Sequence, residues 1–249
     1  RILDQCEKIV ELTHALERSA ENADIIGRSV RVGVSDLVSM TWLPDLLDVL
    51  EVKFPDHAFQ VTTDAAPNLA AALDEHQLDV VFIANGMDDP RVINAPLCGY
   101  RMAWLASPRR FDTRTVVSVE QLCRLPIIMP PPGTPGYMWQ TEYFKRHNPA
   151  FNSEAPDKTR LSCGFSPATG MEMVRAGLGL MPLPVLLAQP LLKSGEVAIM
   201  PVREPFPPLH ITAAYKSPPT FPMITDLVES AQAVTKAYSD RNGGKDIWP

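Results

Sequence analysis

The first third of the chain alternates short apolar runs with stretches in which apolar residues recur at helical spacing. Residues 30–34 and 59–63 have the β-branched composition or the alternation of strands, and residues 78–84 resemble a buried strand. Between these runs, residues 43–54 follow helical spacing, and Pro67 is well placed to open a second helix. The order of strands and helices predicts a parallel sheet in an α/β fold.

A second unit of the same kind follows after a long extended stretch at residues 92–106. Its short apolar runs predict strands at 127–129, 160–163, 178–181 and 197–200. Helical patterns predict helices at 137–147 and from Ser166 and Pro167 to the glycine stop at Gly177. A last extended stretch at 209–215 precedes a closing amphipathic helix over 221–238.

The two extended stretches predict that the chain crosses twice between two lobes. We expect lobe I to contain about residues 28–100 and 212–240, and lobe II about residues 101–211. Residues 241–246 are polar and contain glycine, which indicates that residues 241–249 form a tail.

The N-terminal segment, residues 1–27, has the pattern of a two-faced helix. An apolar stripe recurs at a spacing between 3.5 and 3.6 through Ile2, Cys6, Ile9, Thr13 and Leu16. The helix either packs on its own domain or serves as a linker or dimerisation helix. Because the stripe would otherwise expose apolar surface, we expect the chain to self-associate.

Composition narrows the class of protein. With 45% hydrophobic and 21% charged residues, the 249-residue chain can bury a substantial core, and no apolar run approaches the roughly 20 residues of a membrane span. A net charge of −6 has the wrong sign for a surface that binds the phosphate backbone, so we do not expect this chain to bind nucleic acid strongly. Four scattered cysteines without C-x-x-C spacing, and no secretory leader, favour a cytoplasmic location.

Recognisable catalytic and metal motifs are missing from the sequence. The five histidines lie on different expected elements, and none is paired with Cys, Asp or Glu at metal-ligand spacing, so we expect neither a metal nor a cofactor. No nucleophile elbow, Walker loop or G-x-G-x-x-G follows a strand. A catalytic pair assembled by folding stays open, because such residues need be neighbours only in space.

A proline-rich loop at residues 130–136 directly follows the expected strand at 127–129. Ligands of open parallel sheets bind beyond the carboxyl ends of the strands, where residues 35–40 and 65–68 would also lie. Helix starts expected at Ser39, Pro67 and Ser166 would point free N–H groups into that space. These segments, including Thr134, either line a pocket or are ordinary loops.

Several segments carry short motifs in a fixed order. They are Arg31-Val32-Gly33-Val34 followed by Leu43-Pro44, then Phe54-Pro55, Leu73 leading to Leu78-Asp79-Val80-Val81-Phe82, Val174-Arg175-Ala176-Gly177-Leu178-Gly179-Leu180-Met181-Pro182, and Leu192-Lys193-Ser194-Gly195-Glu196-Val197. Taken together, these segments resemble the regulatory half of LysR-type transcriptional regulators. Their shared order extends over nearly the whole chain, from Val30 to Tyr238. The chain departs from the family pattern at Gln77, Ala66 and Phe165.

The resemblance implies two Rossmann-like lobes of the type II periplasmic-binding-protein kind, joined by two crossing strands, with a small effector between them. It also makes residues 1–27 similar to the family's linker helix. The winged helix-turn-helix expected before that helix is missing, which agrees with a chain that begins at Arg1 and with its acidic balance. DNA contact would then belong to that absent domain, and the regulator would be a homodimer or homotetramer.

By position, the resemblance places a set of residues at the cleft. They are Ser35, Leu37, Ser39, Ala66, Met129, Pro130, Phe165 and Ser166, to which the proline-rich loop adds Thr134. Because this set contains no Arg or Lys, we expect a largely apolar or aromatic, neutral or weakly polar effector. Arg101 or Arg160 could still reach the mouth of the cleft. As a whole, the chain resembles the alkylquinolone-sensing members of this family.

Two other classes of protein share this architecture. A solute-binding receptor of a transporter has the same two lobes and two crossings but requires export, and a signal peptide in the parent gene would identify it. An enzyme on the same fold would require a perturbed acid, base or nucleophile at the cleft, and no recognisable base lies beside Ser35, Ser39, Thr134 or Ser166 in the sequence.

Overall fold

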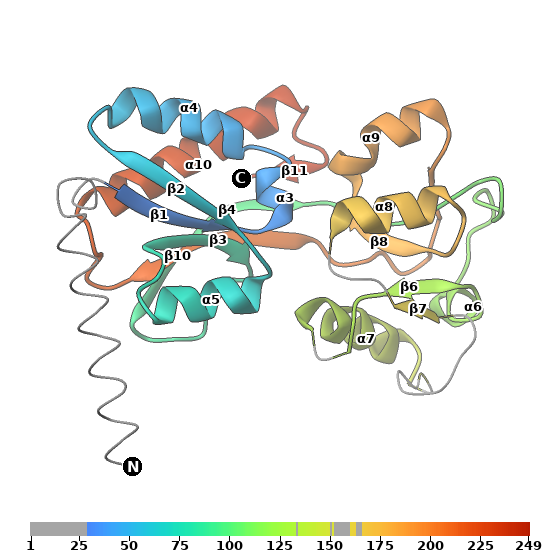
Figure 1. Ribbon diagram of the computed structural model, residues 1–249. Helices are drawn as coiled ribbons and strands as arrows, with labels where there is room; N and C mark the ends of the chain where they lie inside the picture. The colour runs from blue at the N-terminus through green and yellow to red at the C-terminus, as the bar shows by residue number, and fades with distance from the viewer. Residues whose placement is uncertain (1–28, 133, 150, 152–159, 163–165) are drawn as a thin grey trace, which may run out of the picture.

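The computed structural model of the chain describes residues 29–132, 134–149, 151, 160–162 and 166–249. Two lobes, each built on its own sheet, lie side by side and are joined by two extended segments (Figure 1). The expected helix over residues 1–27 and the site residue Phe165 lie outside the described residues. The architecture confirms the two-lobe α/β fold with two crossings.

Lobe I contains a six-stranded sheet in the order β11-β4-β10-β3-β1-β2. Its strands are β1 (Ser29–Val34), β2 (Ala58–Thr63), β3 (Val80–Ala84), β4 (Val92–Tyr100), β10 (Leu209–Lys216) and β11 (Ile247–Trp248). Strand β1 pairs in parallel with β2 and β3, as the βαβαβ pattern predicts, whereas β10 runs antiparallel to both β3 and β4.

Helices cover both faces of this sheet. They are α3 (Asp36–Ser39), α4 (Leu43–Lys53), α5 (Ala66–Asp74) and α10 (Met223–Arg241), with α4 and α10 on one face and α5 on the other (Figure 1). Gly33 on β1 permits the close approach of α5, because a Cβ there would lie 2.6 Å from the Leu78 side chain and 3.0 Å from that of Leu69.

Lobe II contains a three-stranded sheet in the order β8-β5-β9 and a parallel pair β6-β7. Its strands are β5 (Met102–Ala106), β6 (Ile127–Met129), β7 (Arg160–Ser162), β8 (Met181–Pro184) and β9 (Ala198–Ile199). A parallel bridge between Ile127 and Leu180 joins the two groups of strands. The helices are α6 (Val119–Leu122), α7 (Pro135–His147), α8 (Pro167–Arg175) and α9 (Val185–Ser194).

The lobes have separate apolar cores. In lobe II, a cluster of aromatic rings around Trp104, Tyr143, Phe144 and Phe206 fills one face, and α8 and α9 pack on the other face. The chain passes from lobe I to lobe II at Arg101, between β4 and β5, and returns between β9 and β10. Strand β10 begins at Leu209, so residues 209–211 belong to the lobe I sheet rather than to lobe II as expected.

The structure differs from three further expectations. The strand expected at 178–181 lies at Met181–Pro184, because the left-handed turn at Gly177 delays its start. Helix α9 was not expected, since Pro190 inside it interrupts the helical pattern. Residues 241–249 are not simply a polar tail, because Ile247 is fully buried and β11 extends the lobe I sheet.

Candidate functional site

The ends of the parallel strands bring several helix starts to the junction between the lobes. In lobe I, α3 follows β1 and α5 follows β2; in lobe II, α7 follows β6 and α8 follows β7. These four helices begin at the facing ends of the two lobes (Figure 1). Because carboxyl ends of parallel strands are where open α/β sheets bind ligands, we name this region the interlobe site.

Ser35 places a hydroxyl of lobe I at the interlobe site, and this hydroxyl makes no hydrogen bond within the described part of the chain. It is the N-cap residue of α3 by backbone conformation, but its side chain makes no capping hydrogen bond. Its Oγ is buried and has no hydrogen-bond partner. Since buried hydroxyls are normally bonded, this atom is available to a ligand or an ordered water.

The other predicted residues of lobe I contribute less polar surface. Leu37 is 4% exposed and belongs to the lobe I core, and Ala66, the first residue of α5, packs partly against the core beneath that helix. The expectation that a helix starts at Ser39 is wrong, since α3 begins at Asp36 and α4 at Leu43. Ser39 instead ends α3, and its hydroxyl donates to the Asp36 carbonyl at 2.8 Å.

The predicted residues of lobe II form the start of α7 and α8. Met129 and Pro130 are buried at the end of β6. Thr134 caps α7: its Oγ1 accepts from the Tyr137 N–H at 3.3 Å and donates to the Pro131 carbonyl at 2.7 Å. Ser166 is the N-cap residue of α8, and its side chain makes no capping hydrogen bond. As expected, Pro167 opens the helix.

Two carboxylates stand at the helix starts of lobe I, and sequence reasoning missed both. Asp36 occupies the first turn of α3. Asp64 lies directly before the N-cap of α5, where its Oδ1 accepts from the Ala65 N–H at 2.6 Å and from Asn68 Nδ2 at 2.9 Å. The Asn68 and Ala65 hydrogen bonds lower the pKa of Asp64 below its usual value. The signal was present, since an Asp just before a proline-opened helix is typical of a helix start.

The cation nearest the crossing already has a carboxylate partner. Arg101, between β4 and β5, donates through Nη1 to Asp246 Oδ1 at 3.2 Å, and its backbone N–H donates to the Asp246 carbonyl at 3.0 Å. The side chain of Arg160 lies outside the described part of the chain. Arg101 is thus engaged by the C-terminal segment rather than free to meet an anion.

A buried polar pair links α3 and α4 to the crossing strand. Thr41 Oγ1 and the Tyr100 hydroxyl are 2.8 Å apart, and Tyr100 is fully buried. Burial raises the pKa of Tyr100 well above its usual value, and it raises the pKa of the neighbouring Cys98 thiol to about 12. Both groups are therefore neutral at physiological pH and serve as packing and hydrogen-bonding groups.

Two surface depressions lie away from the interlobe site. One is on lobe II and is lined by Arg109, Arg175, Ala176 and Glu196; the other lies between α4 and α10 in lobe I. Neither is lined by a predicted site residue. In the described ranges, no three His, Cys, Asp or Glu side chains gather as a potential metal site, and no helix is long and apolar enough to cross a membrane.

The family model described as the LysR substrate binding domain matches residues 25–235. The chain therefore belongs to the LysR substrate-binding-domain family, whose members are parts of transcriptional regulators rather than enzymes. Comparison with curated protein sequences finds no significant match.

Solved structures of regulators share the fold. A reduced form of OxyR from N. meningitidis superposes with a TM-score of 0.63 at 17% identity, covering 83% of this chain and 93% of that one. The C206 mutant of OxyR from Corynebacterium glutamicum gives a TM-score of 0.70 at 18% identity and covers 96% and 76%. The BenM effector binding domain with its effector benzoate gives 0.64 at 15% identity and covers 87% and 94%.

Proposed function

We propose that this chain is the sensing half of a LysR-type regulator and that it holds a small, uncharged, largely apolar or aromatic effector at the interlobe site. The observation that carries the charge assignment is the pair of carboxylates, Asp36 and Asp64, at the helix starts of lobe I. Helix N-termini attract anions, so a carboxylate already standing there repels a second one.

The state of Arg101 supports the same assignment. An oxyanion usually recruits a guanidinium, an ammonium or several amides, and Arg101 is bonded to Asp246. Ser35 Oγ and the Ser166 hydroxyl offer one polar contact from each lobe, while Met129 and Pro130, at the end of β6, are apolar and buried. Such a site suits a ligand that is mostly apolar and carries one or two hydrogen-bonding groups.

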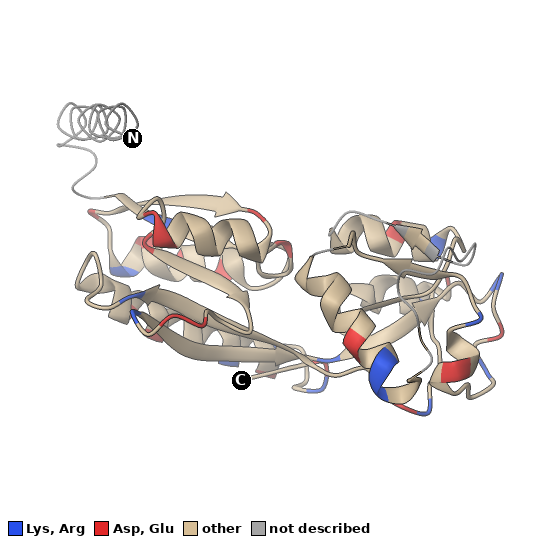
Figure 2. Ribbon diagram, turned by 90° about the horizontal axis from the view of Figure 1, so that it is seen from below, with Lys and Arg blue, Asp and Glu red and all other residues tan. Residues whose placement is uncertain are grey.

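Regulation would follow from a shift between lobe arrangements. An effector that touches both lobes stabilises one arrangement by its difference in affinity, and the associated copies reposition DNA-binding domains through their linker helices. Over the residues that the structure describes, Lys and Arg are interspersed with Asp and Glu on both lobes (Figure 2). DNA contact would therefore belong to an N-terminal domain, in a cytoplasmic protein.

Association into a homodimer or homotetramer is supported by one edge of the lobe I sheet, as far as the described residues show it. Strand β2 is the outermost strand of the sheet, and five of its six residues are exposed. On the neighbouring helix α4, the Val52 side chain is 84% exposed. An uncharged edge strand beside exposed apolar residues is a surface that proteins normally cover.

Calorimetric titration of the purified chain tests the effector class. The probes are sulfate, a muconate-like diacid and a neutral alkylquinolone, and the variants are Ser35→Ala and Ser166→Ala. We expect the neutral aromatic compound alone to bind, and each variant to weaken it about fivefold through loss of one hydrogen bond. Ser194→Ala, at the outer end of α9, is the matched control and should bind normally. Tight binding of the diacid alone contradicts the proposal.

A further inference from the structure

The C-terminal segment turns back from α10 and reaches the junction between the lobes (Figure 1). Strand β11 pairs antiparallel with the end of β4, Ile247 opposite Tyr100 and Trp248 opposite Gly99. The Ser239 hydroxyl of α10 donates to the Ile247 carbonyl at 2.8 Å, and Ile247 is fully buried. This segment is therefore packed into lobe I and does not hang free.

Gly99 on β4 and His210 on β10 form the surface on which Trp248 of this segment packs. A Cβ at position 99 would lie 2.5 Å from the Trp248 indole, so the absence of a side chain at Gly99 lets the ring lie against β4. The His210 ring approaches the same indole, with ring centres 6.3 Å apart in an edge-to-face arrangement. Strands β4 and β10 are the lobe I strands that adjoin the two crossings, and both contact Trp248.

Asp246 is the point at which the segment meets the other lobe. Its carboxylate is nearly buried; Oδ1 accepts from Arg101 at 3.2 Å and Oδ2 from Gln189 Nε2 at 2.7 Å. Arg101 lies on the first crossing and Gln189 on α9 of lobe II. The two oxygens of one side chain are therefore bonded to the crossing and to lobe II, while the backbone on either side of it belongs to lobe I.

Helix α9 of lobe II also packs against lobe I. Its Leu186 and Leu187 lie against the lobe I core, and the Val185 N–H donates to the Arg101 carbonyl at 2.9 Å. A change in the angle between the lobes must move α9 relative to the lobe I sheet, to which β11 belongs. Such a change would break or stretch the Gln189–Asp246 hydrogen bond, a buried contact to a charged acceptor.

We propose that residues 242–249 form a strap that holds lobe II at its present angle to lobe I, with Asp246 as its anchor. The strap lies beyond the matched family region, which ends at residue 235. It sets the balance between lobe arrangements through its own contacts and does not depend on what binds at the interlobe site. Weakening Gln189–Asp246 should release other lobe angles in the effector-free protein.

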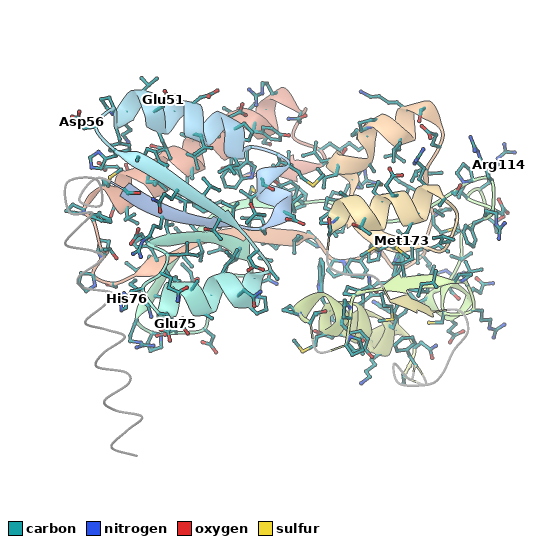
Figure 3. The ribbon with its side chains drawn as sticks, in the orientation of Figure 1. Glu51, Asp56, Glu75, His76, Arg114 and Met173 are labelled. Atoms are coloured by element: carbon teal, nitrogen blue, oxygen red, sulfur yellow. The ribbon has the colours of Figure 1, made fainter. Side chains whose placement is uncertain are left out.

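Distance measurements between the lobes test the strap. Glu75 and Arg114 are exposed at the outer ends of lobe I and lobe II (Figure 3), and both can be replaced by a keto amino acid that carries a spin label, which avoids the cysteines. Pulsed electron resonance then gives the distance distribution for the parent chain and for Gln189→Ala, Asp246→Ala and Asp240→Ala. Asp240 is an exposed carboxylate on α10 and serves as the matched control.

We expect one narrow distribution for the parent chain and for Asp240→Ala, and a shifted or clearly broader one for Gln189→Ala and Asp246→Ala. Gln189→Ala decides the outcome, because it removes only the bond to lobe II and leaves the Arg101–Asp246 pair in place. A parent-like distribution in Gln189→Ala overturns the proposal, whether or not Asp246→Ala folds. Circular dichroism melting of each variant confirms that a broader distribution comes from folded protein.

Discussion

The Asp64 carboxylate is held at the start of α5 by Asn68, whose Nδ2 donates to Asp64 Oδ1 at 2.9 Å. The Ala65 N–H donates to the same oxygen. These bonds lower the pKa of Asp64, so its negative charge persists over the whole range near neutral pH. The charge stands where an anionic effector would otherwise find a helix N-terminus.

Replacing Asp64 by Asn should relax the selection against anions. We expect wild-type protein to bind benzamide more tightly than benzoate, and the ratio of the two affinities to fall about threefold in Asp64→Asn. The benzamide affinity itself should hardly change. Isothermal calorimetry at low ionic strength measures both ligands. Asp112→Asn, an exposed carboxylate of lobe II, is the control, and an unchanged ratio in Asp64→Asn would remove Asp64 from the site.

Arg31 and Asp79 form the main buried ion pair of lobe I. Asp79 is fully buried and accepts from the Arg31 backbone N–H at 2.8 Å, from its Nε at 3.1 Å and from its Nη2 at 2.7 Å. Arg31→Ala would leave the carboxylate in the interior without its guanidinium, and we expect a loss of about 3 kcal/mol in unfolding free energy. Urea denaturation measures this loss.

An exposed pair provides the comparison for Arg31. Arg146 and Glu142 form an ion pair one turn apart on α7, and both side chains are about two-thirds exposed. Arg146→Ala should cost less than about 0.5 kcal/mol, because exposed pairs are solvated and screened. If the two variants lose the same stability, burial does not decide the strength of these ion pairs, and the expected cost of Arg31→Ala is wrong.

Asp89 should contribute to the stability of lobe I only above acidic pH. Hydrogen bonds from the Arg91 side chain and backbone lower its pKa from 3.8 to about 2. Because the folded pKa is depressed, the contribution is fully present above pH 3.8 and disappears as the pH falls toward 2. Urea denaturation of wild type and Asp89→Asn should differ at pH 7 and converge near pH 2. A difference that persists at pH 2 contradicts this assignment.

Cys98 should be unreactive in the folded protein. Burial raises the pKa of its thiol to about 12, so almost no thiolate is present at pH 8. Iodoacetamide followed by peptide mass spectrometry should leave Cys98 unmodified in native protein and modify it fully in urea. Rapid native modification would show that lobe I opens near the crossing.

The sequence predicts the elements whose signals are local. Pro67 and Pro167 fall within the first turns of α5 and α8, and the parallel order of β1, β2 and β3 follows from their apolar runs. Helix α9 was missed because Pro190 lies inside it, where the first-turn rule does not apply. The helix forms despite Pro190 because its apolar residues pack against the cores of both lobes.

The site was harder to predict than the fold for a physical reason. Sequence position placed Ser166 at a helix start and Ser35 only after a strand, and it wrongly placed a helix start at Ser39. It could not show that the hydroxyls of Thr134 and Ser39 donate to nearby backbone carbonyls. Nor could it show that Arg101 meets Asp246, which is 145 residues away in the chain. Such pairs depend on β11, a strand too short to leave a periodic signal.

The most direct test of the central proposal is a crystal structure of the chain with the tightest-binding neutral aromatic probe. We expect electron density for that compound between the lobes, within hydrogen-bond distance of Ser35 Oγ or the Ser166 hydroxyl. Density only in the depression between α4 and α10, or only beside Arg109 and Arg175, would contradict it.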